Sequence, residues 1–153
     1  MNWQVFTELS SLHVQIHWMA ALASAVIGIG IFVRTKGTKL HRFMGRLYVV
    51  LMVITAVSAF FVRSVDPGET YSLLTNFSFI HLLIPLTLHS LYMAIRAIRN
   101  GDVEAHKKNM IYAYIGGIVI AGAFTFLPGR HMHSVFFGDP VEIQQRIDSG
   151  YKH

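Results

Sequence analysis

Long apolar stretches separated by short polar loops are the main pattern along this chain. Four stretches contain no acidic side chain: residues 12–33, 43–62, 77–95 and 110–127. Each holds about 18 to 22 residues and would rise about 1.5 Å per residue as a helix, which is enough to cross the apolar core of a bilayer. The pattern predicts an all-α integral membrane protein, a four-transmembrane-helix bundle. It forms a single domain over residues 1–153, with a short polar tail at 128–153.

The composition agrees with a membrane environment. Hydrophobic residues make up 53% of the chain and charged residues 14%, which is more apolar than a typical soluble domain. The flank before the first stretch, MNWQVFTELSS, has no basic residue and no small-residue cleavage site. We therefore expect the first stretch to be a retained helix rather than a signal peptide.

The basic residues predict the topology. Nine of the thirteen lie in or beside two loops: Arg34, Lys36, Lys39, Arg42, Arg46, Arg96, Arg99, Lys107 and Lys108. The positive-inside rule makes both loops cytoplasmic and places both termini outside. The net charge of +5 also favours anionic lipid headgroups, so membrane lipid is an expected partner. No nucleic-acid partner is expected, because no basic face interleaved with aromatic residues stands clear of the membrane.

The histidines repeat between the two halves of the chain. His17 is followed 24 residues later by His41, and His81 is followed 25 residues later by His106. The turns repeat as well, because Gly-Thr at 37–38 and Gly-Asp at 101–102 suit a helix end followed by an N-cap. We interpret the chain as two repeated helical hairpins. The alternative is that any two hairpins with basic loops share such features.

The repeated turns place His41 and His106 in the first turns of their helices. Tyr48 and Tyr112 follow at similar distances. An ionisable side chain inside a membrane span is costly and usually faces the bundle interior, where it marks a cofactor, ion or proton site. The nine histidines of this apolar chain are therefore its main functional signal.

His17 and His81 lie at matching depth near the outer ends of two helices. Neutral imidazoles that face each other across a four-helix bundle are what a b-type haem needs as axial ligands. Small residues nearby, including Ala20 and Ser24, would leave room for a flat macrocycle or would simply allow close helix packing. Another bound metal and hydrogen-bonded structural histidines are the alternatives.

His89 lies deeper on the same predicted helix as His81. It is a candidate ligand for a second centre, with a structural hydrogen bond as the alternative. Pro85 cannot donate to the carbonyl of His81, so a helix break or an unpaired acceptor is expected beside that histidine.

The inner loops form a basic collar with His41, Arg42, Arg46 and His106. This set suits a quinone head or a lipid phosphate at headgroup depth. The alternative is a collar of snorkelling side chains that only fixes the depth of the helices.

The outer face supports a different chemistry. His13 and His17 are spaced i and i+4, and His131 and His133 follow the fourth stretch. Together they predict a zinc or copper site. Because no carboxylate is near, such a site would store, sense or deliver metal rather than hydrolyse a substrate.

Several chemistries are not expected. The chain has no cysteine, which excludes disulfides, thiolate metal sites and covalently attached c-type haem. The spans contain no acidic residue, which argues against a proton-coupled transporter or an ion channel.

The runs GTKLHRFMGRLYVV, FSFIHLLIPLTLHSLYMAIRAIRNGDVEAHKKNM and FTFLPGR make the chain similar to an uncharacterised family of bacterial four-helix membrane proteins. This resemblance implies a multi-pass protein of the bacterial inner membrane. In architecture the chain also resembles cytochromes of the b561 type, which hold two haems between histidines. That likeness implies His17 with His81 as an outer ligand pair and His41 with His106 as an inner pair, although the inner pair here lies at headgroup depth.

The sequence thus predicts a small histidine-rich membrane protein that binds b-type haem for electron transfer or interacts with quinone. An outer-face zinc or copper protein, or a non-catalytic accessory subunit, is the alternative. Other membrane subunits or a second copy are possible partners, and helix against helix is the expected contact.

Overall fold

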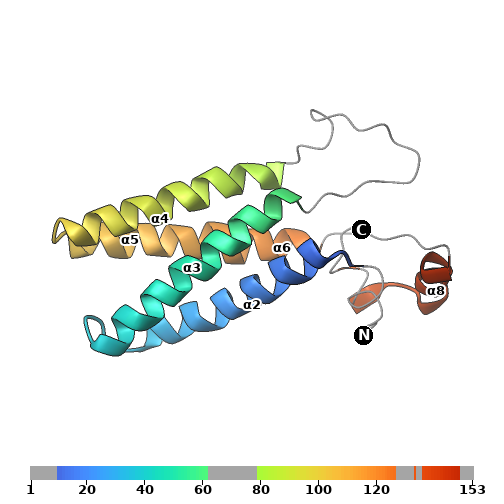
Figure 1. Cartoon of the computed structure of the whole chain (residues 1–153), viewed down its shortest axis with the longest axis horizontal. Coiled ribbons are helices and arrows are strands. Elements are labelled where there is room, and N and C mark those ends of the chain that lie inside the picture. Colours follow the sequence, from blue (N-terminus) through green and yellow to red (C-terminus); the bar gives the residue numbers. More distant parts are fainter. Residues whose placement is uncertain (1–9, 62–78, 127–132, 134–135, 149–153) are drawn as a thin grey trace.

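The computed structural model describes residues 10–61, 79–126, 133 and 136–148, and within these ranges it contains helices and turns but no strand. Its helical segments, in order, are α2 (Leu12–Val33), α3 (Lys39–Phe61), the 3₁₀ turn η1 (Phe79–Leu82), α4 (Leu83–Arg99), α5 (Val103–Tyr114), the π-helical η2 (Ile115–Ile120), α6 (Ala121–Thr125) and α8 (Pro140–Asp148). α5, η2 and α6 follow one another as a single rod, so four rods run side by side (Figure 1). The all-α prediction is confirmed.

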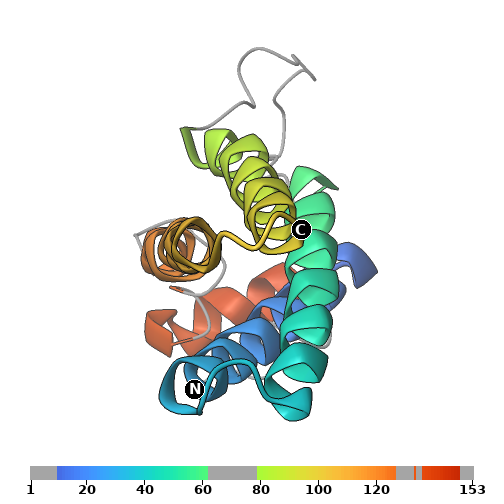
Figure 2. The same cartoon turned by 90° about the vertical axis from the view of Figure 1, so that its left-hand side faces the viewer.

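The four rods form two hairpins, α2 with α3 and α4 with α5, and both hairpins turn at the same end of the bundle (Figure 1). Viewed along the bundle, the rods surround a common interior (Figure 2). α3 packs against α4, and η2 packs against both α2 and α4. The basic residues beside the two turns therefore gather at one end, which we call the turn end; the opposite end is the open end.

Both turns have the predicted chemistry. Gly37 and Gly101 adopt φ values of 81° and 79°, in the left-handed region that glycine enters without steric cost. The Thr38 hydroxyl accepts the N–H of His41 at 3.1 Å, and the Asp102 carboxylate accepts the N–H of Ala105 at 2.8 Å. Each cap satisfies a backbone donor that the first helical turn cannot pair.

Many large apolar side chains lie on the outside of the bundle, whereas many buried positions carry small or weakly polar residues beside the larger Tyr48, Met52 and Leu91. Leu12 and Val33 are 67% and 81% exposed. The buried face of α2 carries Ala20, Ser24 and Gly28, spaced one turn apart. The same holds on the neighbouring helices, where Thr55, Ala56, Ser58, Thr87, Ser90 and Ala94 are buried. This arrangement is typical of helices that meet through small residues and turn their large side chains to lipid.

Two of the four predicted spans are confirmed as helices of sufficient length. α2 and α3 are long and apolar enough to cross a membrane. α4 is a shorter helix of 17 residues, and the last rod is interrupted by η2 in the middle of its apolar part. That these two rods also cross the membrane stays a prediction.

The last rod begins at Val103, as the predicted cap at Asp102 requires. The apolar span predicted over residues 110–127 covers only its later part, because the first turns carry the exposed charged residues Glu104, Lys107 and Lys108. Pro85 is the third residue of α4, directly after η1. The change from 3₁₀ to α-helix thus lies between His81 and the proline that cannot donate to its carbonyl.

The C-terminal tail is more ordered than the predicted polar segment. α8 begins at Pro140, and the Asp139 carboxylate accepts the N–H of Val141 at 2.8 Å. Pro in the first turn after an Asp cap is a common helix start. The Asp-Pro pair was the available signal for this helix.

Candidate functional site

His17 lies on α2 at the open end of the bundle, and its ring contacts α3. Its Nδ1 is 3.0 Å from the carbonyl oxygen of Thr55 and 3.1 Å from the hydroxyl of Ser58. A carbonyl only accepts hydrogen bonds, so Nδ1 must carry the proton. Ser58 in turn donates to the carbonyl of Ile54 at 2.6 Å, which leaves its oxygen free to accept. The neutral His17 ring therefore presents an unprotonated Nε2.

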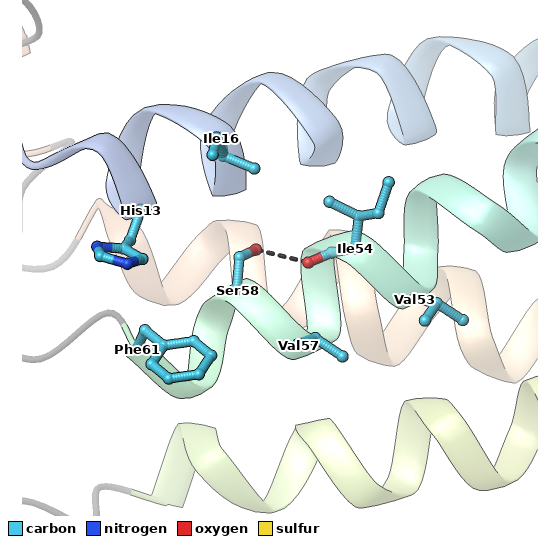
Figure 3. A pocket seen from close by; sticks show the side chains of 7 residues that line it. All are labelled: His13, Ile16, Val53, Ile54, Val57, Ser58 and Phe61. Carbon is cyan, nitrogen blue, oxygen red and sulfur yellow. Dashed lines mark hydrogen bonds between the residues drawn. The ribbon is translucent and has the colours of Figure 1, made fainter.

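An apolar groove of about 420 Å³ opens beside His17 on the surface between α2 and α3 (Figure 3). Seven side chains line it: His13, Ile16, Val53, Ile54, Val57, Ser58 and Phe61. The rings of His13 and Phe61 stack at the end of the groove that lies toward the open end of the bundle. Their centroids are 5.7 Å apart and their planes 29° apart. Ser58 thus faces the groove and also contacts His17, so the groove and the His17 ring share one hydroxyl.

The other predicted haem ligands lie on the second hairpin. His81 is half-buried in η1, directly before α4. α4 packs against α3, and α3 carries Thr55 and Ser58, which contact the His17 ring. His89 lies two turns further along α4 with an exposed side chain, so it faces the bundle surface. The predicted ligand roles of these residues stay predictions.

His41 and His106 both lie at the turn end. Nδ1 of His106 donates to the carbonyl of Ala94 at 2.9 Å, so its Nε2 is also unprotonated in the neutral ring. His41 lies within electrostatic range of His106 and of Lys36. Its Nδ1 is buried and has no hydrogen-bond partner among the described residues. An unpaired buried nitrogen is uncommon in a folded protein.

The predicted basic collar divides into two parts. Arg42 and Arg46 are exposed, whereas His41 is half-buried. A helix turns by about 100° per residue, so both arginines lie on a different side of α3 from His41. The arginines face the surroundings of the bundle, where lipid phosphates are the expected contacts.

The predicted outer metal site is only partly described. His13 lies in the groove, and the half-buried His133 packs its ring 5.4 Å from that of Phe137. His131 lies outside the described residues. Within the described ranges, no group of three or more His, Cys, Asp or Glu side chains is placed to hold a metal ion. A site that includes His131 therefore stays a prediction.

A tyrosine layer crosses the middle of the bundle. The rings of Tyr48 and Tyr114 stack with centroids 6.5 Å apart, and the Tyr114 hydroxyl donates to the carbonyl of Ala25 at 3.3 Å. The repeat predicted Tyr112 as the counterpart of Tyr48, but Tyr112 is exposed and lies under Lys108. Tyr114 was missed because the second helix carries one more residue between its histidine and this layer.

Two buried hydroxyls in the interior have no hydrogen-bond partner among the residues that the structure describes. Tyr48 is 1% exposed and Ser24 is fully buried, and neither hydroxyl makes a hydrogen bond within the described residues. Leaving a buried hydroxyl unpaired costs about 1 to 3 kcal/mol.

This contrast predicts opposite effects for two equivalent substitutions. Tyr48→Phe should leave the free energy of unfolding unchanged or raise it, because it removes an unpaired hydroxyl. Tyr114→Phe should lower the same quantity by about 0.5 to 1.5 kcal/mol, the usual value of a hydrogen bond. Unfolding in mixed detergent micelles, followed by circular dichroism, measures both. A larger loss for Tyr48→Phe would show that its hydroxyl has a partner, such as a bound water.

Comparison with known proteins gives one match. Residues 14–144 match the family described as "Predicted membrane protein (DUF2306)". No curated protein and no solved structure matches the chain. The matched range covers most of the chain and includes both hairpins and their histidines. The chain therefore belongs to this family of membrane proteins.

Proposed function

We propose that this protein binds a b-type haem at the open end of the bundle and transfers electrons within the bacterial inner membrane, with His17 and His81 as the axial ligands. The observation that carries the proposal is the hydrogen bond from Nδ1 of His17 to the Thr55 carbonyl. Metal-bound histidines almost always donate their other ring nitrogen in this way, which fixes the tautomer and the ring orientation.

Small side chains occupy the interior next to the proposed ligands. Ala20 and Ser24 continue the buried face of α2, and Thr87 and Ser90 are buried on α4. In this structure they let the helices approach closely, and they would line a haem site if the helices moved apart. A bound haem would supply a reversible one-electron couple, and the chain would contribute the two imidazoles and an apolar enclosure.

Visible absorption spectroscopy tests the proposal. The protein is expressed with ample haem supply, purified in detergent, and measured in oxidised and reduced forms. We expect a Soret band that shifts on reduction together with resolved α and β bands, as low-spin bis-histidine haem gives. A featureless spectrum from folded protein would overturn the haem proposal and leave the accessory-subunit function.

The groove beside His17 supports a second function, the binding of a membrane quinone. Its volume is in the range of small-molecule sites, and the stacked His13 and Phe61 rings offer an aromatic surface and a hydrogen-bonding nitrogen at one end. Ile16, Val53 and Val57 would contact an isoprenoid tail. The sequence predicted the quinone at the basic collar, but the groove lies at the opposite end.

Quinone binding predicts a specific effect of Phe61→Ala. Loss of the stacking surface should weaken binding of a short-chain quinone about 5- to 30-fold, since aromatic contacts of this kind contribute about 1 to 2 kcal/mol. Quenching of intrinsic fluorescence during quinone titration measures the affinity. Phe43→Ala, which removes an exposed phenylalanine of α3 outside the groove, is the matched control. Equal affinities of the two variants would exclude the groove.

A further inference from the structure

A histidine, a methionine and a tyrosine recur in the same order on α3 and α5. On α3 they are His41, Met44 and Tyr48, and on α5 they are His106, Met110 and Tyr114. Spacings of three and four residues place each set on one face of its helix. The two helices therefore carry the same three kinds of side chain inward from the turn end.

The structure brings the tyrosines together and places the two histidines at the turn end. The tyrosine rings stack, and His41 lies within electrostatic range of His106. Between the histidines and the tyrosines along α3 and α5, Met44 and Met110 both pack against the buried core cluster that contains Tyr48. We call His41, His106, Met44 and Met110 the His–Met cluster.

The nitrogen donors of the His–Met cluster are available. Nε2 of His106 is unprotonated because Nδ1 donates to the Ala94 carbonyl, which is the orientation that metal-bound histidines have. Nδ1 of His41 is buried and lacks a partner among the described residues. Neither nitrogen has a role in haem binding at the open end.

The Met44 thioether packs beside a glycine of α2. The methyl carbon of Met44 packs against Gly30 of α2. A Cβ added to Gly30 would lie 3.1 Å from this methyl carbon. Methionine has three rotatable bonds and a polarisable sulfur, and it changes conformation at low cost.

We propose that the His–Met cluster binds a copper(I) ion. Two thioethers and two neutral imidazoles form a soft donor set, which selects Cu(I), whereas Zn²⁺ is bound by thiolate, imidazole or carboxylate. The neighbouring charge of Lys36 repels a monovalent ion less than a divalent one. This site is separate from the proposed haem ligands.

Anaerobic Cu(I) titration against a chromogenic chelator tests the proposal, using full-length protein purified with a tag that contains no histidine. We expect one high-affinity Cu(I) per chain. Met44→Leu and Met110→Leu should each weaken Cu(I) binding about 10- to 100-fold, the range seen when metal sites are disturbed. Leucine conserves volume, so these variants keep the packing. Met19→Leu, which changes an exposed methionine of α2, is the control.

Each outcome decides the proposal. Loss of Cu(I) affinity in both methionine variants and in His106→Ala, with Met19→Leu unchanged, supports the four-donor site. Unchanged affinity in both methionine variants overturns it, even if His106→Ala loses binding, because the thioethers would then not be ligands. Preference for Zn²⁺ over Cu(I) also overturns it. Haem content of the same samples reports the open end independently.

Discussion

Replacing His17 with alanine is expected to lower the haem content of the purified protein at least about tenfold, the minimum loss typical of a disturbed metal site. The variant lacks the Nε2 that the Thr55 carbonyl orients, and the other histidine of α2, His13, is exposed. His17 is only half-buried, so the fold should persist. The ratio of Soret to protein absorbance, with circular dichroism as a measure of folding, gives the result.

Two further variants separate ligation from general effects. His89→Ala removes an exposed histidine of α4 and should retain wild-type haem content. Ser58→Ala removes one acceptor of the His17 ring but keeps the Thr55 carbonyl, so it should keep the haem while altering its reduction potential, because outer hydrogen bonds tune the metal. Wild-type haem content in folded His17→Ala and His81→Ala would contradict the proposed ligation.

The hairpin turns were the part of the fold most readily predicted from sequence. Gly37 and Gly101 have positive φ, and Thr38 and Asp102 cap the helices that follow. Such turns depend on residues that are adjacent in the chain, so local chemistry decides them. The bounds of α2 were also predicted, because its apolar stretch contains no charged residue.

The later helices show what a hydropathy pattern alone leaves out. The charged first turns of α5, which include Glu104 and Lys107, lie outside the apolar stretch, and the start of this helix was predicted from the Gly-Asp turn instead. The π-helical segment η2 depends on packing. Gly117 approaches Thr87 of α4 so closely that an added Cβ would lie 3.1 Å from the threonine side chain. A contact between distant segments cannot be inferred from local residues.

The candidate sites divide in a similar way. The sequence predicted that His17, His41 and His106 belong to functional sites, because an ionisable side chain in an apolar helix usually has a functional role. It did not predict that His17 and His106 share one hydrogen-bonding pattern, since their acceptors are backbone carbonyls of Thr55 and Ala94. Every residue has a carbonyl, so residue type carries no signal for such an acceptor.

The second large effect is expected from Gly28→Ala in α2. An added Cβ would lie 2.4 Å from Cε2 of Tyr114 and 3.2 Å from Cε2 of Tyr48, so both rings of the tyrosine layer would have to move. Overpacking of this kind costs about 1 to 3 kcal/mol, which outweighs the gain of up to about 1 kcal/mol in helix propensity. The free energy of unfolding in mixed micelles should therefore fall.

Gly45→Ala is the matched control for Gly28→Ala, and it should have the opposite sign. Gly45 also lies within a helix, but nothing approaches within 4 Å of an added Cβ, so only the propensity gain of about 0.5 to 1 kcal/mol remains. Because the shortest contact at Gly28 is with the Tyr114 ring, Tyr114→Leu should relieve much of the loss in a double-mutant cycle. A gain in stability for Gly28→Ala equal to that for Gly45→Ala would mean that the tyrosines do not pack on this glycine.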